Sequence, residues 1–183
     1  MSINICVYCG SRTPDDIQLA DQAKELGASI ANRNWGLVYG GGKVGMMGIV
    51  ADAALAQNGE VIGIIPTALK RAEVVHTGVT KIIETADMHT RKALMEKKSS
   101  AFVVLPGGFG TLDEFFEILT WRQLGFHNKP IILVNAKGYF DGLASFVDKA
   151  ISEDFIRSNN RDLFWITANV EEALTVLEEQ IDQ

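Results

Sequence analysis

The sequence is poor in cysteine, histidine, proline and net positive charge. Its 183 residues include 2 cysteines, 3 histidines and 4 prolines, and the histidines show no spacing typical of metal ligands, so we assign no metal site. Lysine and arginine number 17 against 23 acidic residues, giving a net charge of −6. This balance argues against a nucleic-acid-binding surface, which needs an excess of basic side chains. Any anion site must be local.

The sequence also lacks a long apolar run. No stretch approaches the roughly 18 apolar residues of a membrane-spanning helix, and residues 1–4 lead straight into an expected strand without a signal peptide. We therefore expect a cytoplasmic protein with no membrane partner. The length and the 47% hydrophobic content predict a single domain over residues 1–183.

The two cysteines are Cys6 and Cys9, within an expected strand at residues 3–9. Side chains three positions apart in a strand point to opposite faces. A redox pair or a zinc site is therefore not expected, and both cysteines are predicted to be small buried residues.

Apolar strand-like segments alternate with amphipathic helical segments along the whole chain. Parallel strands need crossover helices, so this alternation predicts an α/β fold of the Rossmann-like, doubly wound type, with a mostly parallel sheet flanked by helices on both faces. The expected strands are residues 3–9, 36–39, 61–65, 81–85, 101–105, 130–134 and 163–167. The expected helices are residues 15–32, 45–57, 88–98, 112–121, 140–153 and 170–181.

A glycine-rich turn at residues 107–111, with the sequence Gly-Gly-Phe-Gly-Thr, joins a buried strand to a helix. Glycines allow positive φ angles and close approach of a ligand, and the first N–H groups of the helix point into the turn. This arrangement favours phosphate binding. We expect Gly108→Val to crowd the turn and to weaken nucleotide binding.

A simpler interpretation of the same turn is helix capping. Thr111 and Glu114 match the capping box, in which Thr111 caps the helix and Glu114 reaches back to the Thr111 N–H. Both interpretations explain Glu114, and the sequence pattern leaves them open.

A second glycine cluster follows the second expected strand. Gly40, Gly42 and Gly45 match the dinucleotide-binding pattern, but the next strand does not end in the acidic residue that would hold a ribose. NAD is therefore not expected.

Arg91 and Lys92 lie in the first turn of a helix that Asp87 could cap. Adjacent basic residues usually form a solvated face, although a nearby anion would also explain them.

Residues 106–114 match the signature P-G-G-x-G-T-x-x-E, and with them the chain resembles the LOG family of cytokinin-activating phosphoribohydrolases, long labelled possible lysine decarboxylases. Residues 9–11, 38–42, 45–48 and 88–92 resemble the other family motifs in the same order. Met46 and Asp113 are minor departures from the family pattern.

The resemblance implies hydrolysis of the N-glycosidic bond in adenine-type nucleoside 5′-monophosphates, including AMP and N6-prenylated nucleotides. It implies that Arg91 and Glu114 are catalytic. The implied substrate-binding and phosphate-binding residues are Gly10, Ser11, Gly41, Gly42, Glu73, Lys92, Gly107, Gly108, Phe109, Gly110, Thr111 and Thr120.

The chemistry of the reaction agrees with these roles. Glycosidic cleavage builds positive charge on the ribose, which a carboxylate such as Glu114 can stabilise, or the carboxylate can activate water. Arg91 stays protonated and cannot act as the base, so its expected roles are to orient Glu114, to bind phosphate or hydroxyls, or to assist the departing base. No redox step is involved, so no cofactor is expected. A homodimer is expected from the family, with Phe115, Phe116 and Trp121 either at the interface or in the core.

Two other functions compete with hydrolysis. A nucleotide-binding module that does not cleave its ligand is the alternative, and the presence of both Arg91 and Glu114 counts against it. A decarboxylase would need pyridoxal phosphate on a lysine, and the sequence singles out none. The sequence does not identify the preferred base or the biological role.

Overall fold

The computed structural model describes residues 2–71 and 74–181, and all of its strands belong to one sheet. The strand order is β4-β3-β2-β1-β5-β6-β7, and every neighbouring pair is parallel, which confirms the predicted doubly wound α/β fold. The strands are β1 (Asn4–Tyr8), β2 (Gly36–Tyr39), β3 (Val61–Pro66), β4 (Lys81–Thr85), β5 (Ala101–Val104), β6 (Ile131–Val134) and β7 (Trp165–Thr167). The helices are α1 (Ile17–Asn32), α2 (Gly45–Ala56), η1 (Thr67–Arg71), α3 (Met88–Lys98), α4 (Phe109–Gln123), η2 (Ala136–Gly138), α5 (Asp141–Ser152), η3 (Ser158–Leu163) and α6 (Val170–Ile181).

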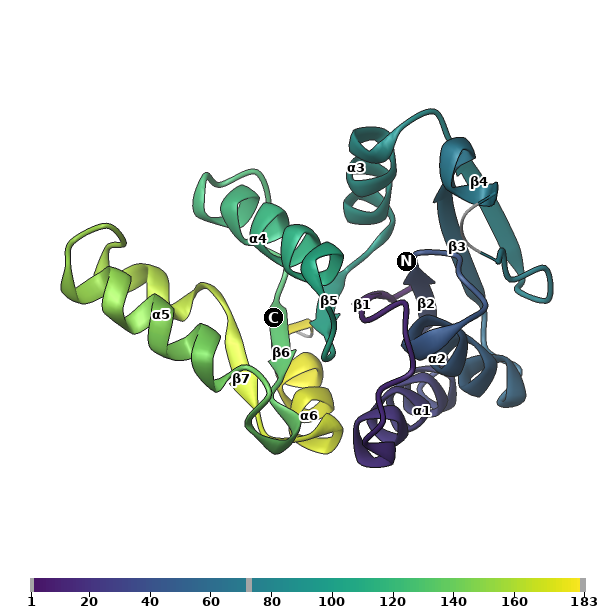
Figure 1. Ribbon diagram of the computed structural model, residues 1–183, viewed down its shortest axis with the longest axis horizontal. Helices are drawn as coiled ribbons and strands as arrows, with labels where there is room; N and C mark the ends of the chain where they lie inside the picture. Colours follow the sequence, from purple (N-terminus) through teal and green to yellow (C-terminus); the bar gives the residue numbers. More distant parts are fainter. Residues whose placement is uncertain (1, 72–73, 182–183) are drawn as a thin grey trace.

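Two hydrophobic cores lie on opposite faces of the sheet. Helices α1, α2 and α6 cover one face, and α3, α4 and α5 cover the other (Figure 1). Cys9 belongs to the first core and Cys6 to the second, as the strand period predicts, and both are free and buried. Strands β2, β3, β5 and β6 are buried on both faces, which explains their continuous apolar sequences.

The strand order reverses between β1 and β5. The chain runs outward from β1 to β4, and α3 then returns it to β5 on the other side of β1. The loops that leave these two neighbouring strands touch, because the Gly10 N–H donates to the Pro106 carbonyl at 3.1 Å. Ligands of doubly wound folds bind at such a reversal, outside the carboxyl ends of the strands.

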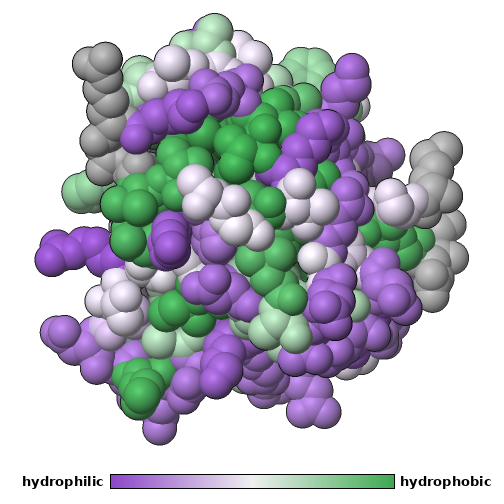
Figure 2. Space-filling model, turned by 90° about the vertical axis from the view of Figure 1, so that its right-hand side faces the viewer, coloured by the Kyte–Doolittle hydropathy of each residue, from purple (hydrophilic) through white to green (hydrophobic). Residues whose placement is uncertain are grey.

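The other edge of interest is the outer strand β4. Its Lys81 and Glu84 are exposed, and its Ile82 and Ile83 are half-buried. Figure 2 views the molecule from the side of β4 and shows apolar surface interrupted by hydrophilic side chains. Charged groups on an exposed edge discourage pairing with other chains.

Across the described part of the chain, no helix has the length and apolarity needed to cross a bilayer.

Candidate active site

Helix α4 begins earlier than the sequence pattern predicts. Its first residue is Phe109, its N-cap is Gly108, and no side chain caps it. Thr111 is therefore the third helical residue and is buried, and Glu114 lies in the second turn. The capping-box interpretation was wrong, because Thr111 is inside the helix that it was expected to cap.

In this turn glycine allows close packing at position 107 and leaves open space at positions 108 and 110, and none of the three has a positive φ. Positive φ is found at Gly41 and Gly45 but not at Gly107, Gly108 or Gly110, so the 107–111 turn does not use the positive φ that its glycines allow. A Cβ on Gly107 would lie 2.1 Å from Thr111 Oγ1. A Cβ on Gly108 would meet no atom within 4 Å, so a side chain crowds the turn at position 107 and not at position 108.

Arg91 enters the site from the first turns of α3. The helix starts as predicted, with the Asp87 carboxylate accepting the Thr90 N–H at 2.7 Å. Arg91 is only 6% exposed; its Nε donates to the Ile64 carbonyl at 3.0 Å and its Nη2 to the Gly40 carbonyl at 3.3 Å. Carbonyl groups at the ends of β3 and β2 thus fix the guanidinium. The solvated-face interpretation of this residue does not hold.

Glu114 reaches the same place from α4. Its Oε1 lies 3.7 Å from Arg91 Nη2, and its side chain is 11% exposed. A guanidinium stays positively charged and attracts a neighbouring carboxylate. The two residues that the family resemblance implies to be catalytic therefore form one buried ion pair between α3 and α4.

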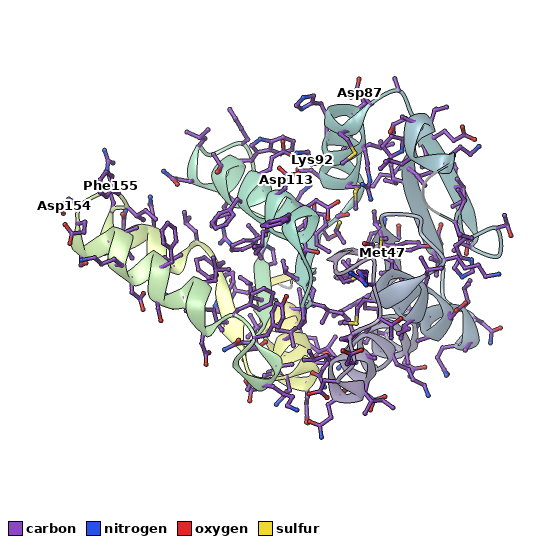
Figure 3. All side chains as sticks on the ribbon, in the orientation of Figure 1. Met47, Asp87, Lys92, Asp113, Asp154 and Phe155 are labelled. Carbon is purple, nitrogen blue, oxygen red and sulfur yellow. The ribbon has the colours of Figure 1, made fainter. Side chains whose placement is uncertain are left out.

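The pair borders a cavity of about 200 Å³, which we call the switch-point cavity. Helices α2, α3 and α4 contribute to its lining, and in Figure 3 Met47 of α2 lies below α3. The N-terminal end of α4 opens into this cavity, where its unpaired N–H groups favour an anion. The lining residues are Cys9, Ser11, Met47, Met88, Arg91, Gly108, Phe109, Gly110, Thr111, Asp113 and Glu114.

Cys9 is the one thiol among these lining residues. Burial, together with the nearby Glu114 carboxylate, raises the pKa of Cys9 well above its ordinary value. A thiol is nucleophilic as the thiolate, so Cys9 contributes an apolar wall and no nucleophile. Within residues 2–71 and 74–181, no three histidine, cysteine, aspartate or glutamate side chains are grouped as a metal site requires.

Comparison with known proteins identifies the family. A family model described as possible lysine decarboxylase matches residues 47–177. Cytokinin riboside 5′-monophosphate phosphoribohydrolase LOG1 of Arabidopsis thaliana is 44% identical over 177 residues, covering 97% of this chain and 83% of the relative. The chain belongs to the LOG family. A further LOG relative, the probable phosphoribohydrolase LOGL6 of Oryza sativa subsp. japonica, is 45% identical over 95% of this chain and 70% of its own length.

Solved structures share the LOG fold at lower sequence identity. The molybdenum cofactor carrier protein of Chlamydomonas reinhardtii superposes with a TM-score of 0.76 at 22% identity, covering all of both chains. TM1055 gives a TM-score of 0.70 at 21% identity, over 98% of this chain and 99% of its own. At this level of identity the similarity establishes the fold alone.

Lys92 is placed differently from what the LOG resemblance implies. It is 8% exposed, and in Figure 3 it lies beside Asp113. Its Nζ lies 3.1 Å from Asp113 Oδ2 and 3.1 Å from Glu117 Oε1. Burial by itself lowers the pKa of Lys92, but hydrogen bonds to Glu117 and Asp113 outweigh it and leave the pKa raised. Lys92 thus joins α3 to α4 beside the switch-point cavity and is not among its lining residues.

The other residues implied by the LOG resemblance divide into two groups. Ser11 and the turn residues Gly108, Phe109, Gly110 and Thr111 line the switch-point cavity. The remaining residues do not line it: Gly107 and Gly10 pack against each other behind the turn, Gly41 and Gly42 pair with the 75–76 segment, and Thr120 Oγ donates to the Phe116 carbonyl. Glu73 lies outside the described residues.

Four lining residues were not predicted: Cys9, Met47, Met88 and Asp113. Their position in the sequence could have identified them. Each either follows the end of a strand or lies in the first two turns of the helix after that strand. Side chains at these places converge on the carboxyl edge of the sheet. Phe115, expected at the interface or in the core, is fully buried in the core, whereas Phe116 is partly exposed.

Proposed function

We propose that this chain hydrolyses the N-glycosidic bond of adenine-type nucleoside 5′-monophosphates, AMP and N6-prenylated nucleotides, to the free base and ribose 5-phosphate. The supporting observation is that the buried Arg91–Glu114 pair and the N-terminus of α4 border one cavity. An anion-binding element and a fixed carboxylate at one cavity suit a phosphorylated sugar. The family relatives named phosphoribohydrolases support the same reaction.

The substrate orientation follows from the lining. The 5′-phosphate binds the N–H groups at the start of α4, and the ribose lies between this turn and Glu114. A cavity of about 200 Å³ is smaller than the roughly 300–1,000 Å³ of whole-ligand pockets, so the base extends to the rim. Met88 and Phe109 are exposed there, Phe109 to 95%, and offer apolar surface to a purine or a prenyl chain.

The reaction needs one water molecule and no cofactor. The C1′–N9 bond breaks with its electron pair going to the base, water oxygen bonds to C1′, and the proton lost by water is balanced by one gained by the base. Glu114 stabilises the oxocarbenium-like ribose or accepts the proton of water. Arg91 remains protonated and orients the Glu114 carboxylate.

The name possible lysine decarboxylase does not suit the chemistry of this site. A Schiff-base lysine must be neutral to attack, which requires a lowered pKa. The lysine beside the cavity is Lys92, and its two carboxylate partners raise its pKa. We therefore assign Lys92 no covalent role.

We also propose that the protein acts as a homodimer in the cytoplasm, with a small-molecule nucleotide as its substrate and no nucleic acid or membrane as partner. Exposed apolar side chains on α4, α5 and the turns that follow them support an interface between copies. They are Phe116, Leu124, Phe126, Phe146 and Phe155, the last at the far end of α5 in Figure 3. Sedimentation velocity tests the dimer, and a monomer at micromolar concentration would contradict it.

The test of the reaction is chromatographic detection of free base from AMP and from isopentenyladenosine monophosphate, with wild-type protein and Glu114→Gln. Glutamine keeps the size of the side chain and removes its charge and basicity. We expect wild type to release base and Glu114→Gln to lose a factor of about 10² to 10⁴ in rate. Glu96→Gln is the matched control, because Glu96 is a half-buried glutamate paired with Lys129 away from the cavity.

The outcomes separate the two candidate functions. Base release that needs Glu114 but not Glu96 supports the hydrolase, and the ratio of the two rates identifies the preferred substrate. Binding without release, seen as a raised melting temperature with either nucleotide, would replace the hydrolase with a non-catalytic nucleotide-binding module.

A further inference from the structure

A second hollow borders the glycine turn and, unlike the switch-point cavity, is not lined by Glu114. Arg12, Leu19 and Tyr139 contribute to its lining, together with Gly107 and Gly108. Gly108 lines this hollow and the switch-point cavity, so the turn is a thin wall between them. A side chain that contacts this wall from the second hollow therefore affects the backbone groups of the turn that face the switch-point cavity.

Tyr139 contacts the wall from the second hollow. Its hydroxyl donates to the Gly107 carbonyl oxygen at 2.7 Å. The Gly107–Gly108 peptide is trans, and in a trans peptide the C=O and the following N–H point in opposite directions. Fixing the Gly107 carbonyl toward Tyr139 therefore turns the Gly108 N–H toward the switch-point cavity.

We infer that Tyr139 is a positioning residue for phosphate binding, which acts by holding the Gly107–Gly108 peptide with its N–H toward the ligand. This inference rests on the proposed function, which places a phosphate at the same turn. Tyr139 touches no substrate atom. Its effect passes through the peptide that it holds.

The Tyr139 hydroxyl holds the Gly107 end of this turn. Helix α4 holds the other end, where the Gly108 carbonyl accepts the Leu112 N–H at 3.1 Å. A peptide between two glycines rotates more freely than any other, because neither neighbour has a Cβ to hinder it. The hydroxyl of Tyr139 supplies the contact that favours one orientation.

The loop after β6 is constructed so that it presents Tyr139. Asn135 Oδ1 accepts the Phe140 N–H at 2.6 Å, and its Nδ2 donates to Asp141 at 2.7 Å. Phe140 is buried and packs edge-on against the Tyr139 ring, with centroids 5.0 Å apart. Tyr139 itself is 48% exposed, so core packing does not account for its place.

The test compares ligands with and without a phosphate. Titration calorimetry measures the affinity of wild type and Tyr139→Phe for ribose 5-phosphate and for adenosine. We expect Tyr139→Phe to bind ribose 5-phosphate about tenfold more weakly, the effect of one lost hydrogen bond, and to bind adenosine unchanged. In turnover of AMP, KM rises while kcat stays within about twofold.

Lys137→Met is the matched control. It lies in the same loop and loses a surface ion pair with Asp16, while the Tyr139 hydroxyl is kept. We expect it to match wild type with both ligands. Equal affinity of wild type and Tyr139→Phe for ribose 5-phosphate would overturn the inference, as would an equal loss with adenosine, which indicates a general structural effect. If wild type binds no ribose 5-phosphate, the proposed function fails, and the inference fails with it.

Discussion

The two glycine turns of this molecule, after β2 and after β5, resemble each other in sequence but differ in what their glycines do. After β2, a Cβ on Gly45 would lie 2.3 Å from the Ser11 carbonyl carbon, and Gly41 and Gly45 both have positive φ. After β5, Cβ atoms on Gly108 and Gly110 would meet no atom within 4 Å. The first turn uses glycine to pack chain against chain. In the second turn Gly107 is also closely packed, against Thr111, but Gly108 and Gly110 leave open space.

The helices that follow these turns differ in the same way. At the start of α2, the Met46 and Met47 N–H groups donate to the carbonyls of Arg12 and Gly10, at 3.4 and 3.3 Å. The start of α4 faces the switch-point cavity instead. A glycine-rich strand–helix turn therefore indicates an anion site only when the helix N-terminus is open to a ligand. This contrast is the reason that we place the phosphate at the second turn.

The largest effect is expected from Gly45→Ala, which tests the packed turn. Alanine adds a backbone clash at Ser11 and must adopt φ +67, so we expect the free energy of unfolding to fall by about 3 kcal/mol. Chemical denaturation measures this difference. A loss below about 1 kcal/mol would contradict the packing role assigned to the turn.

Gly40→Ala tests the link between the first turn and the catalytic pair. Its Cβ would lie 2.3 Å from Arg91 Nη2, so the guanidinium must move away from the Gly40 carbonyl and from Glu114. We expect kcat/KM for base release to fall about 10²-fold, as displaced catalytic groups do. Gly142→Ala is the control, because a Cβ there meets nothing within 4 Å. Full activity of Gly40→Ala would show that the position of Arg91 does not matter.

Gly110→Ala probes the open turn and has the opposite signature to Gly45→Ala. Alanine in a helix is favoured over glycine by about 0.5–1 kcal/mol, and no atom obstructs it, so stability stays the same or rises. The methyl group borders the cavity, and we expect the affinity for ribose 5-phosphate to fall about tenfold. Calorimetry and denaturation on one preparation measure both. Unchanged affinity would remove Gly110 from the anion site.

The smallest effect is expected from Lys92→Met, which removes the positive charge beside the second turn. Because hydrogen bonds to Glu117 and Asp113 raise the folded-state pKa of Lys92 above 10.5, its contribution to stability is complete below that pH and is lost as the pH rises above it. We expect Lys92→Met to cost about 1 kcal/mol at pH 8 and to flatten this alkaline decline. Denaturation across pH 8–11.5 is the measurement. If the stability of the variant falls at alkaline pH as steeply as that of wild type, another titrating group causes the decline.

The fold was predictable because its signals are local. The alternation of apolar strands and amphipathic helices gives β2, β4 and α3 with the expected bounds. The start of α4 was not predictable, since Thr111 suits an N-cap in sequence, and its burial against Gly107 depends on how the loops after β1 and β5 pack together.

The candidate site was predictable in part. Arg91 and Glu114 carry a family motif, and the structure brings them together. The burial of Arg91 and Lys92 was not predictable, because their partners come from β2, β3 and α4, far away in the sequence. Tyr139 gives no sequence signal, since its role depends on a carbonyl 32 residues away.

The most direct test of the central claim is to follow backbone amide resonances by NMR while ribose 5-phosphate is added. The claim is that the anion binds the N-terminus of α4 and not the glycine turn after β2. The largest shifts are then expected at Gly108, Phe109 and Gly110, with Gly41 and Gly45 close to their unliganded positions. The largest shifts at Gly41 and Gly45, with Gly108 and Gly110 unmoved, would contradict the account.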